Sequence, residues 1–190
     1  MRVPSNSIAD NKQMRRVLTS FWPIAVRDFA GCDFSYADLR GVQLAGCQVQ
    51  GGNFRGANLR GANLRGADAR GTVFDFADLT AADCTEALMQ GARLRQARLD
   101  YVSLRHVLLL SAHLEHASLH ATDFTGANCE WAWVDGLDFQ RAIVSCALFL
   151  NVRGLSDVAQ RTIEARGGFT GTRPRRVYWY TSNDSWTRAV

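Results

Sequence analysis

The sequence predicts an all-β solenoid, in which a regularly bent chain closes into coils that stack on one another. The first observation is the segment 53–71, which reads NFRGANLRGANLRGADARG and writes a five-residue unit, A-(N/D)-L-R-G, nearly four times. A period of five fits neither the two-residue alternation of a flat strand nor the 3.6-residue period of a helix. Self-similarity at a fixed period is the sequence signature of a repeat architecture.

The second observation is that this register runs unbroken from Phe29 to Phe149, in 25 units. The central residue of every unit lacks charge and amide groups, and the residue two positions before it is Ala in 15 units. Cys, Val, Thr or Gly fills this small position in the other units, except for Arg27 and Leu137. Because side chains alternate along an extended chain, the central and small residues face the same side. We expect both columns to form the core.

The A-(D/N)-L-x-x pattern resembles that of the pentapeptide repeat family over residues 27–151. The resemblance implies a right-handed quadrilateral β-helix with four units in each coil. The 25 units would then make about six coils, and a strand spacing of about 4.8 Å gives a rod of about 30 Å. Gly at the last position of many early units is suited to a left-handed turn.

Residues 1–26 predict a helical cap on the first coil. Ser7–Asp10 resembles a capping box, Pro23 ends the predicted helix, and the apolar residues between them fall at helical spacing: Met14, Val17, Leu18 and Phe21. An alternative is an export leader built on Arg15 and Arg16. We disfavour it because polar residues interrupt the apolar run and no A-x-A cleavage site follows.

Residues 152–168 predict a second helical cap, on the last coil. Ser156 is the expected N-cap, Gly167 and Gly168 are the expected stop, and the inward stripe is Val158, Ala159 and Ile163. Residues 169–190 form a basic aromatic tail, with candidate interaction residues Arg173, Arg175, Arg176, Tyr178, Trp179 and Tyr180. We expect the tail to lie as a short strand over the solenoid or over a sister chain. Stacking on nucleic-acid bases is the alternative.

Composition bounds the compartment and the chemistry. The five Cys show no CxxC pair and four lie in inward columns, so we expect reduced thiols in a cytoplasmic protein. The sequence contains no run of about 18 apolar residues, which a membrane-spanning helix would require. The sequence has no nucleophile–base pair, phosphate loop or carboxylate pair suited to acid–base chemistry, so we expect neither an enzyme nor a cofactor.

Most outward residues of the predicted solenoid are polar, and a few apolar outward residues are exceptions to this pattern. They gather on one side of the predicted coil and at its corner, and are the candidate interaction residues Leu88, Leu108, Leu110, Trp131, Trp133, Leu148 and Leu150. Val73 also lies near this corner. Exposed apolar patches mark interaction sites. The tail or N-terminal helix, a second copy of the chain, or another protein could cover them.

Charged and histidine residues suggest no second site. The chain carries a formal charge of +4, yet the repeat holds ten basic and thirteen acidic residues, and its arginines are spread around all four sides. A nucleic-acid groove needs a directed basic track, so we expect a solvated surface. The histidines are His106, His113, His116 and His120. They lack the converging Cys or carboxylate of a tetrahedral metal site, and we expect them on the surface.

A rigid rod with regular outward columns is suited to holding another molecule. Our first hypothesis is a non-catalytic protein-binding scaffold or adaptor, homodimeric through the apolar face or the tail. The family resemblance implies an alternative, because some members mimic duplex DNA and protect DNA gyrase or topoisomerase IV from inhibitors. The acidic later coils agree with that alternative, whereas the net basic charge and the lack of an outward loop disagree. Binding of nucleic acid by the tail is a third hypothesis.

Overall fold

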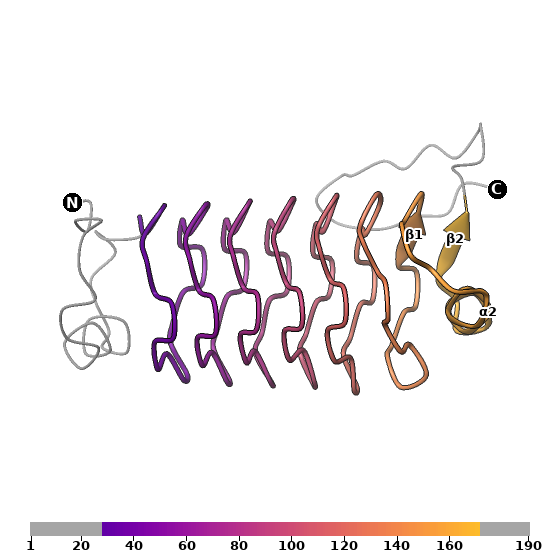
Figure 1. Ribbon diagram of the computed structural model, residues 1–190, viewed down its shortest axis with the longest axis horizontal. Helices are drawn as coiled ribbons and strands as arrows, with labels where there is room; N and C mark the ends of the chain where they lie inside the picture. Colours follow the sequence, from indigo (N-terminus) through magenta and orange to yellow (C-terminus); the bar gives the residue numbers. More distant parts are fainter. Residues whose placement is uncertain (1–27, 172–190) are drawn as a thin grey trace.

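The computed structural model describes residues 28–171, and within them the chain winds into a straight stack of coils (Figure 1). Parallel backbone bridges join residues 20 positions apart, from Asp28↔Gln48 at one end to Trp133↔Arg153 at the other. A step of 20 residues is four units, so each unit forms one side of a coil. The predicted N-terminal helix (1–26) lies outside the described residues, as do the tail residues Arg173, Arg175, Arg176, Tyr178, Trp179 and Tyr180.

Each unit is extended through its centre and bends at the residue two positions later. In the unit centred on Leu59, the Leu59 N–H donates to the Asp78 carbonyl of the next coil at 2.7 Å, and Gly61 has a left-handed φ of +64°. The Ala62 N–H donates back to the Leu59 carbonyl at 2.9 Å and closes the corner. Each side of a coil therefore contains only a few residues in extended conformation. In the described chain, only Leu148–Leu150 (β1) and Phe169–Gly171 (β2) form strands of three residues.

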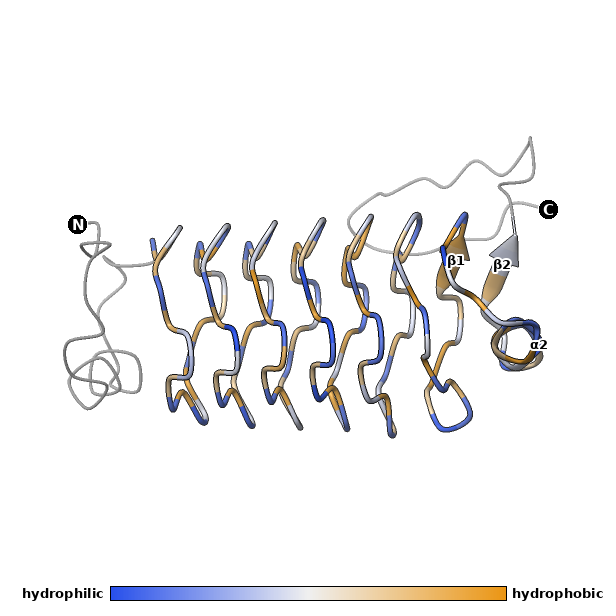
Figure 2. Cartoon of the chain, viewed as in Figure 1, coloured by the Kyte–Doolittle hydropathy of each residue, from blue (hydrophilic) through white to orange (hydrophobic). Residues whose placement is uncertain are grey.

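The core is a thin column of side chains along the axis, and its predicted membership is confirmed. All 25 central residues are buried, and so is every small position from Cys32 to Ala147. Apolar and polar residues are interspersed along each coil (Figure 2). Equivalent side chains stack between coils; the ring centroids of Phe34 and Phe54 are 4.9 Å apart. Since full burial of a Leu or Phe side chain contributes about 2 kcal/mol, these columns stabilise the solenoid.

One position departs from the ladder. Bridges join Arg98 to Ser118, but none joins Ser118 to Asp138, 20 residues further on. Leu137 occupies the small position of this unit, and we attribute the missing bridge to its larger side chain. The Ser118 hydroxyl is buried without a hydrogen-bond partner in the part of the chain that the structure describes.

Helix α2 (Asp157–Ala165) lies at the end of the stack (Figure 1). Ser156 is its N-cap, and the Ser156 hydroxyl accepts a hydrogen bond from the Ala159 N–H at 3.2 Å. Ala159 and Ile163 are buried, whereas Val158 is 59% exposed. The prediction that Val158 faces inward is therefore wrong. One residue corresponds to about 100° around a helix, which turns Val158 away from the stripe formed by its neighbour Ala159.

After α2 the chain returns to the solenoid. Gly168 packs closely, since a Cβ there would lie 2.6 Å from Ile163 Cγ2. Strand β2 then pairs in parallel with β1, with Leu148 opposite Phe169 and Leu150 opposite Gly171. This pairing adds one more rung beyond the last coil, in residues that the sequence assigns to the tail.

Candidate interaction site

Two neighbouring sides of the solenoid carry the residues singled out in the sequence. Face A is the side whose inward residues are Phe29, Val49, Ala69, Met89, Leu109, Cys129 and Phe149. Face B is the next side along the chain, with inward residues Phe34, Phe54, Phe74, Leu94, Leu114 and Val134. On each face, the residues just before and just after these centres form outward columns at 20-residue steps.

Face A holds an apolar patch, which we define as Leu88, Leu108 and Leu110. Leu88 and Leu108 are bridged across adjacent coils, and all three side chains are half-buried. Earlier positions of the Leu88 column are polar: Gln48 and Asp68. The apolar character therefore begins part-way along the face.

Leu148 and Leu150 continue these columns but are not exposed. Their exposed fractions are 6% and 4%, and both belong to β1, which pairs with β2. The sequence left open whether the chain's own tail covers the apolar outward residues, and at Leu148 and Leu150 it is β2 that pairs with them. The chain's own β2 lies alongside the end of face A and leaves the apolar patch further down the same face.

The two tryptophans lie at the corner that follows face A and on face B. Trp131 stands at the corner between faces A and B, has a left-handed φ of +63° and is 54% exposed. Trp133 is on face B and half-buried, with its ring stacked 5.4 Å from the His113 ring at an interplanar angle of 14°. On the other side of the indole, the Arg153 guanidinium carbon lies 4.5 Å from the Trp133 ring centroid.

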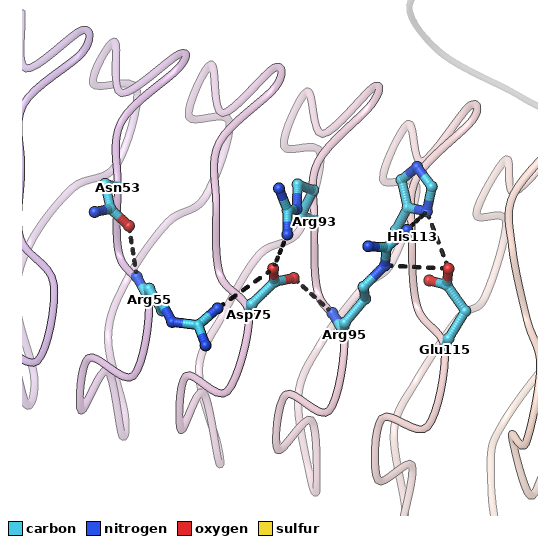
Figure 3. Close-up of polar contacts among 7 residues, drawn as sticks. All are labelled: Asn53, Arg55, Asp75, Arg93, Arg95, His113 and Glu115. Carbon is cyan, nitrogen blue, oxygen red and sulfur yellow. Dashed lines mark hydrogen bonds and ion pairs between the residues drawn. The ribbon is translucent and has the colours of Figure 1, made fainter.

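Face B also carries a ladder of compensated charges, centred on a carboxylate that sequence reasoning missed. Asp75 is 1% exposed, and its Oδ2 lies 2.5 Å from Arg93 Nη2 and 3.9 Å from Arg55 Nη1 (Figure 3). Its Oδ1 accepts a hydrogen bond from the Arg95 N–H at 3.1 Å. The 20-residue step could have found this site, because it places Asp75 between Arg55 and Arg95 in one column.

The ladder continues through Glu115. Its Oε1 lies 3.2 Å from Arg95 Nε and 3.1 Å from His113 Nδ1 (Figure 3). Partial burial opposes ionisation of Glu115, but the hydrogen bond with His113 and the nearby charge of Arg95 hold its pKa below the ordinary value. The charges along this column thus alternate as Arg55, Asp75, Arg95 and Glu115, and they neutralise one another.

Arginines elsewhere in the coils are compensated in the same way. Asp78 lies within 4 Å of both Arg60 and Arg98, and Asp123 lies 3.1 Å from Arg105. Every arginine from Arg40 to Arg105 has such a carboxylate partner: Arg40, Arg55, Arg60, Arg65, Arg70, Arg93, Arg95, Arg98 and Arg105. The geometry favours a solvated, self-compensated surface over a basic track for nucleic acid.

The remaining histidines lie on corners or edges of the coils. The rings of His106 and His116 lie over Gly126 and Gly136, where a Cβ would come within 2.5 Å and 2.3 Å of them. Within residues 28–171, no group of three His, Cys, Asp or Glu side chains is placed to hold a metal ion. A groove beside α2 is lined by Gln140, Val158, Arg161, Thr162, Ala165 and Arg166, which do not form a nucleophile–base pair. No helix of the described chain is long and apolar enough to span a bilayer.

The family model for pentapeptide repeats matches in eight copies, over residues 28–61, 37–75, 57–96, 77–109 and 103–141. No curated protein matches the sequence.

Solved structures similar to this one are pentapeptide repeat proteins. HetL, involved in heterocyst differentiation regulation in the cyanobacterium Nostoc sp. strain PCC 7120, is 26% identical with a TM-score of 0.53. The match covers 66% of this chain and 54% of HetL, so the chain spans about half the length of that relative. This likeness, with the family match, indicates a right-handed β-helix.

Two further structures match less closely in three dimensions. A trypsin-treated form of QnrB1, a plasmid-mediated fluoroquinolone resistance protein, is 21% identical with a TM-score of 0.46, over 75% of this chain and 79% of QnrB1. A protein from the Arabidopsis thaliana thylakoid lumen is 27% identical with a TM-score of 0.28, over 74% of this chain and 78% of its own.

Proposed function

The chain belongs to the pentapeptide repeat family, and we propose that it is a non-catalytic protein-binding scaffold that forms a homodimer through the apolar patch on face A. The family match indicates no catalytic activity. The observation that carries the proposal is the patch itself. Leu88, Leu108 and Leu110 are outward residues on a rigid ladder, where neighbouring columns carry polar side chains.

The energetic argument for association rests on the contrast between these leucines and the charged columns. Exposed ion pairs contribute at most about 1 kcal/mol each, and their charges are already paired within the chain. Each leucine that becomes fully buried contributes up to about 2 kcal/mol. A second copy presents the same patch, so a two-fold contact would bury six leucine side chains at once.

The cysteines support a cytoplasmic location for the scaffold. Cys32, Cys47, Cys84 and Cys129 are buried in the core as thiols rather than disulfides, and they pack there as small apolar side chains. Burial raises the pKa of the Cys84 thiol to about 12. A fold that packs reduced thiols between its coils is suited to a reducing compartment.

Light scattering on the purified protein tests the dimer. We expect wild type to have twice the monomer mass, and Leu108→Asp to be monomeric at the same concentration. Gln48→Asp is the matched control, because Gln48 lies in the same column of face A outside the patch. A wild type that stays monomeric at high concentration contradicts the dimer, as does a Gln48→Asp variant that dissociates equally.

The alternative function is a DNA mimic that binds DNA gyrase or topoisomerase IV and protects it from inhibitors. Residues 71–150 favour this alternative with ten acidic residues against five arginines. The ion pairs oppose it, because five of those acids, Asp75, Asp78, Glu86, Glu115 and Asp123, lie within 4 Å of an arginine. A mimic of duplex DNA needs a continuous, uncompensated negative surface.

A supercoiling assay with purified gyrase, with and without a quinolone, separates the two functions. The scaffold proposal predicts no effect on supercoiling or on inhibition at micromolar protein. Protection of gyrase at that concentration would favour the DNA mimic instead.

A further inference from the structure

Three residues on face B form a stack along the solenoid axis. His113, Trp133 and Arg153 are bridged in succession at 20-residue steps, so their side chains follow one another in a single column. The His113 and Trp133 rings are nearly parallel, and Arg153 covers the opposite face of the indole. Stacking on an aromatic ring fixes the plane of a guanidinium and leaves its edge free to donate hydrogen bonds.

Arg153 is unlike the arginines of the earlier coils. Its guanidinium makes no hydrogen bond or ion pair with any residue in the range 28–171, whereas every arginine from Arg40 to Arg105 has a carboxylate partner. Asp135 lies close by, against Gly154, but does not form an ion pair with Arg153. An exposed guanidinium with a fixed plane and no partner for its donors among residues 28–171 matches a carboxylate, which it can bind through two parallel hydrogen bonds.

Trp131 adds an apolar surface to this cation. It lies two residues before Trp133, and its left-handed backbone places it at the corner, with 54% of its surface exposed. The Trp131 N–H is bonded to the Leu150 carbonyl at 3.0 Å, so the corner is fixed to the backbone of β1. Trp and Arg are, together with Tyr, enriched among the residues that dominate binding energy at protein interfaces.

We propose that Trp131, Trp133 and Arg153 form a second binding site, which takes an acidic segment of a partner protein. A carboxylate of the segment pairs with Arg153, and an adjacent aliphatic or aromatic side chain packs on Trp131. This site goes beyond the dimer of the proposed function, because it lies at the corner and on face B, whereas the apolar patch lies on face A. A monomeric protein would carry it equally well.

The surrounding charge favours a peptide over a nucleic acid. Two carboxylates lie in the neighbouring column of face B: Glu115 follows His113 by two residues, and Asp135 follows Trp133 by two residues. A polyphosphate backbone would meet these carboxylates along its length, whereas a single carboxylate needs only Arg153. Tight nucleic-acid binding requires several phosphate contacts from a basic surface.

Phage display tests the proposal without knowledge of the partner. A library of random dodecapeptides is selected on immobilised full-length protein, and recovered peptides are synthesised with a fluorescein label for anisotropy. We expect the selected sequences to carry Asp or Glu next to an aliphatic or aromatic residue. Arg153→Gln should weaken the best peptide at least tenfold, Arg153→Lys less, and Trp131→Ala several-fold.

Arg141→Gln is the matched control, because Arg141 is an exposed arginine near the same end of the solenoid but outside the stack. It should bind the selected peptide as wild type does. Selection of peptides without acidic residues, recovery of no peptide, or equal binding by Arg153→Gln overturns the proposal. Binding of a labelled oligo-dT strand that depends on Arg153 overturns it in favour of nucleic acid.

The same peptide measured on Leu108→Asp separates this site from the dimer. We expect unchanged peptide affinity in that variant, whether or not wild type self-associates. A monomeric wild type that still binds the acidic peptide contradicts only the proposed dimer. A dimer that selects no acidic peptide contradicts only the site at Arg153. Loss of the peptide on Leu108→Asp would contradict the separation of the two sites.

Discussion

Faces A and B share one backbone and one 20-residue step, yet their outward columns differ in kind. On face B, Arg55, Asp75, Arg95 and Glu115 follow one another with alternating charge, and each finds its partner within the chain. On face A, the outward column changes from Gln48 and Asp68 to Leu88 and Leu108, which have no partners of that kind. Inward residues therefore determine the fold, while outward residues are free to differ between faces and to carry function.

The largest expected effect on stability comes from truncating an inward leucine, compared with truncating its outward neighbour. Leu109 is fully buried between coils, whereas its neighbour Leu108 belongs to the apolar patch. We expect Leu109→Ala to lower the free energy of unfolding by about 3 kcal/mol, through lost burial and a cavity. Leu108→Ala should cost less than about 1 kcal/mol in the monomer. Urea unfolding measures both, and equal losses would contradict the assignment of the two columns.

The next largest effect tests whether the buried carboxylate of face B stabilises the fold. Asp75→Ala leaves Arg55 and Arg93 without their partner and removes the acceptor of the Arg95 N–H. Because both arginines stay partly exposed, we expect a loss of about 2 kcal/mol rather than that of a fully buried pair. Asp33→Ala, at an exposed aspartate of the same face, is the control and should cost less than half as much. Thermal unfolding compares them, and a silent Asp75→Ala would show that the ladder contributes nothing.

Acid should weaken the charged faces before it affects the leucines. Partial burial opposes ionisation of Asp78 and Asp123, but hydrogen bonds from Thr80 and Thr125 and nearby arginines hold the pKa of each carboxyl below the ordinary value. Glu115 behaves in the same way. A carboxyl whose pKa is lower in the folded protein stabilises it above the unfolded pKa of about 4, and that contribution is lost as pH falls through the folded pKa.

The expected result is an unfolding temperature that is nearly constant between about pH 7 and pH 5 and falls below about pH 4. Asp123→Asn should flatten this decline, because an amide cannot be protonated there. Calorimetry across the pH series measures it. A melting temperature that rises on acidification would contradict the assigned directions.

The smallest effect reports which thiols the coils cover. Four cysteines are buried, and burial raises the pKa of the Cys84 and Cys129 thiols, whereas Cys146 is exposed at a corner. Ellman's reagent should therefore react with one thiol per native chain and with five after unfolding in urea. In Cys146→Ser the native signal should vanish. Reaction of several native thiols would mean that the coils open on the time scale of the assay.

Much of the fold could be predicted because every unit needs an apolar or small side chain at its inward positions. The core columns follow from the five-residue period alone, and Leu137 stood out as a large residue at a small position, where the ladder is interrupted. By contrast, β2 spans only three residues and carries no repeat of its own. Nothing in Phe169–Gly171 alone indicates that it would pair with β1 and cover Leu148 and Leu150.

The candidate site was predicted less completely, because the contacts of outward side chains are made with residues 20 positions away in the sequence. Asp75 resembles any other polar outward residue until it is placed between Arg55 and Arg95. Trp133 was grouped with the leucines as apolar, but on face B it stacks between His113 and Arg153, its neighbours in the same column. The 20-residue step predicts which outward residues are neighbours, but only when the residues of every outward column are compared in turn.

The central claim is that self-association belongs to face A and not to the solenoid surface in general. Sedimentation equilibrium over a range of concentrations tests it on wild type, Leu108→Asp and Gln43→Asp, the last at an exposed outward position on another side. We predict a dimer for wild type, the same dissociation constant for Gln43→Asp, and at least a tenfold weaker one for Leu108→Asp. A monomeric wild type, or equal weakening by both substitutions, would contradict the account.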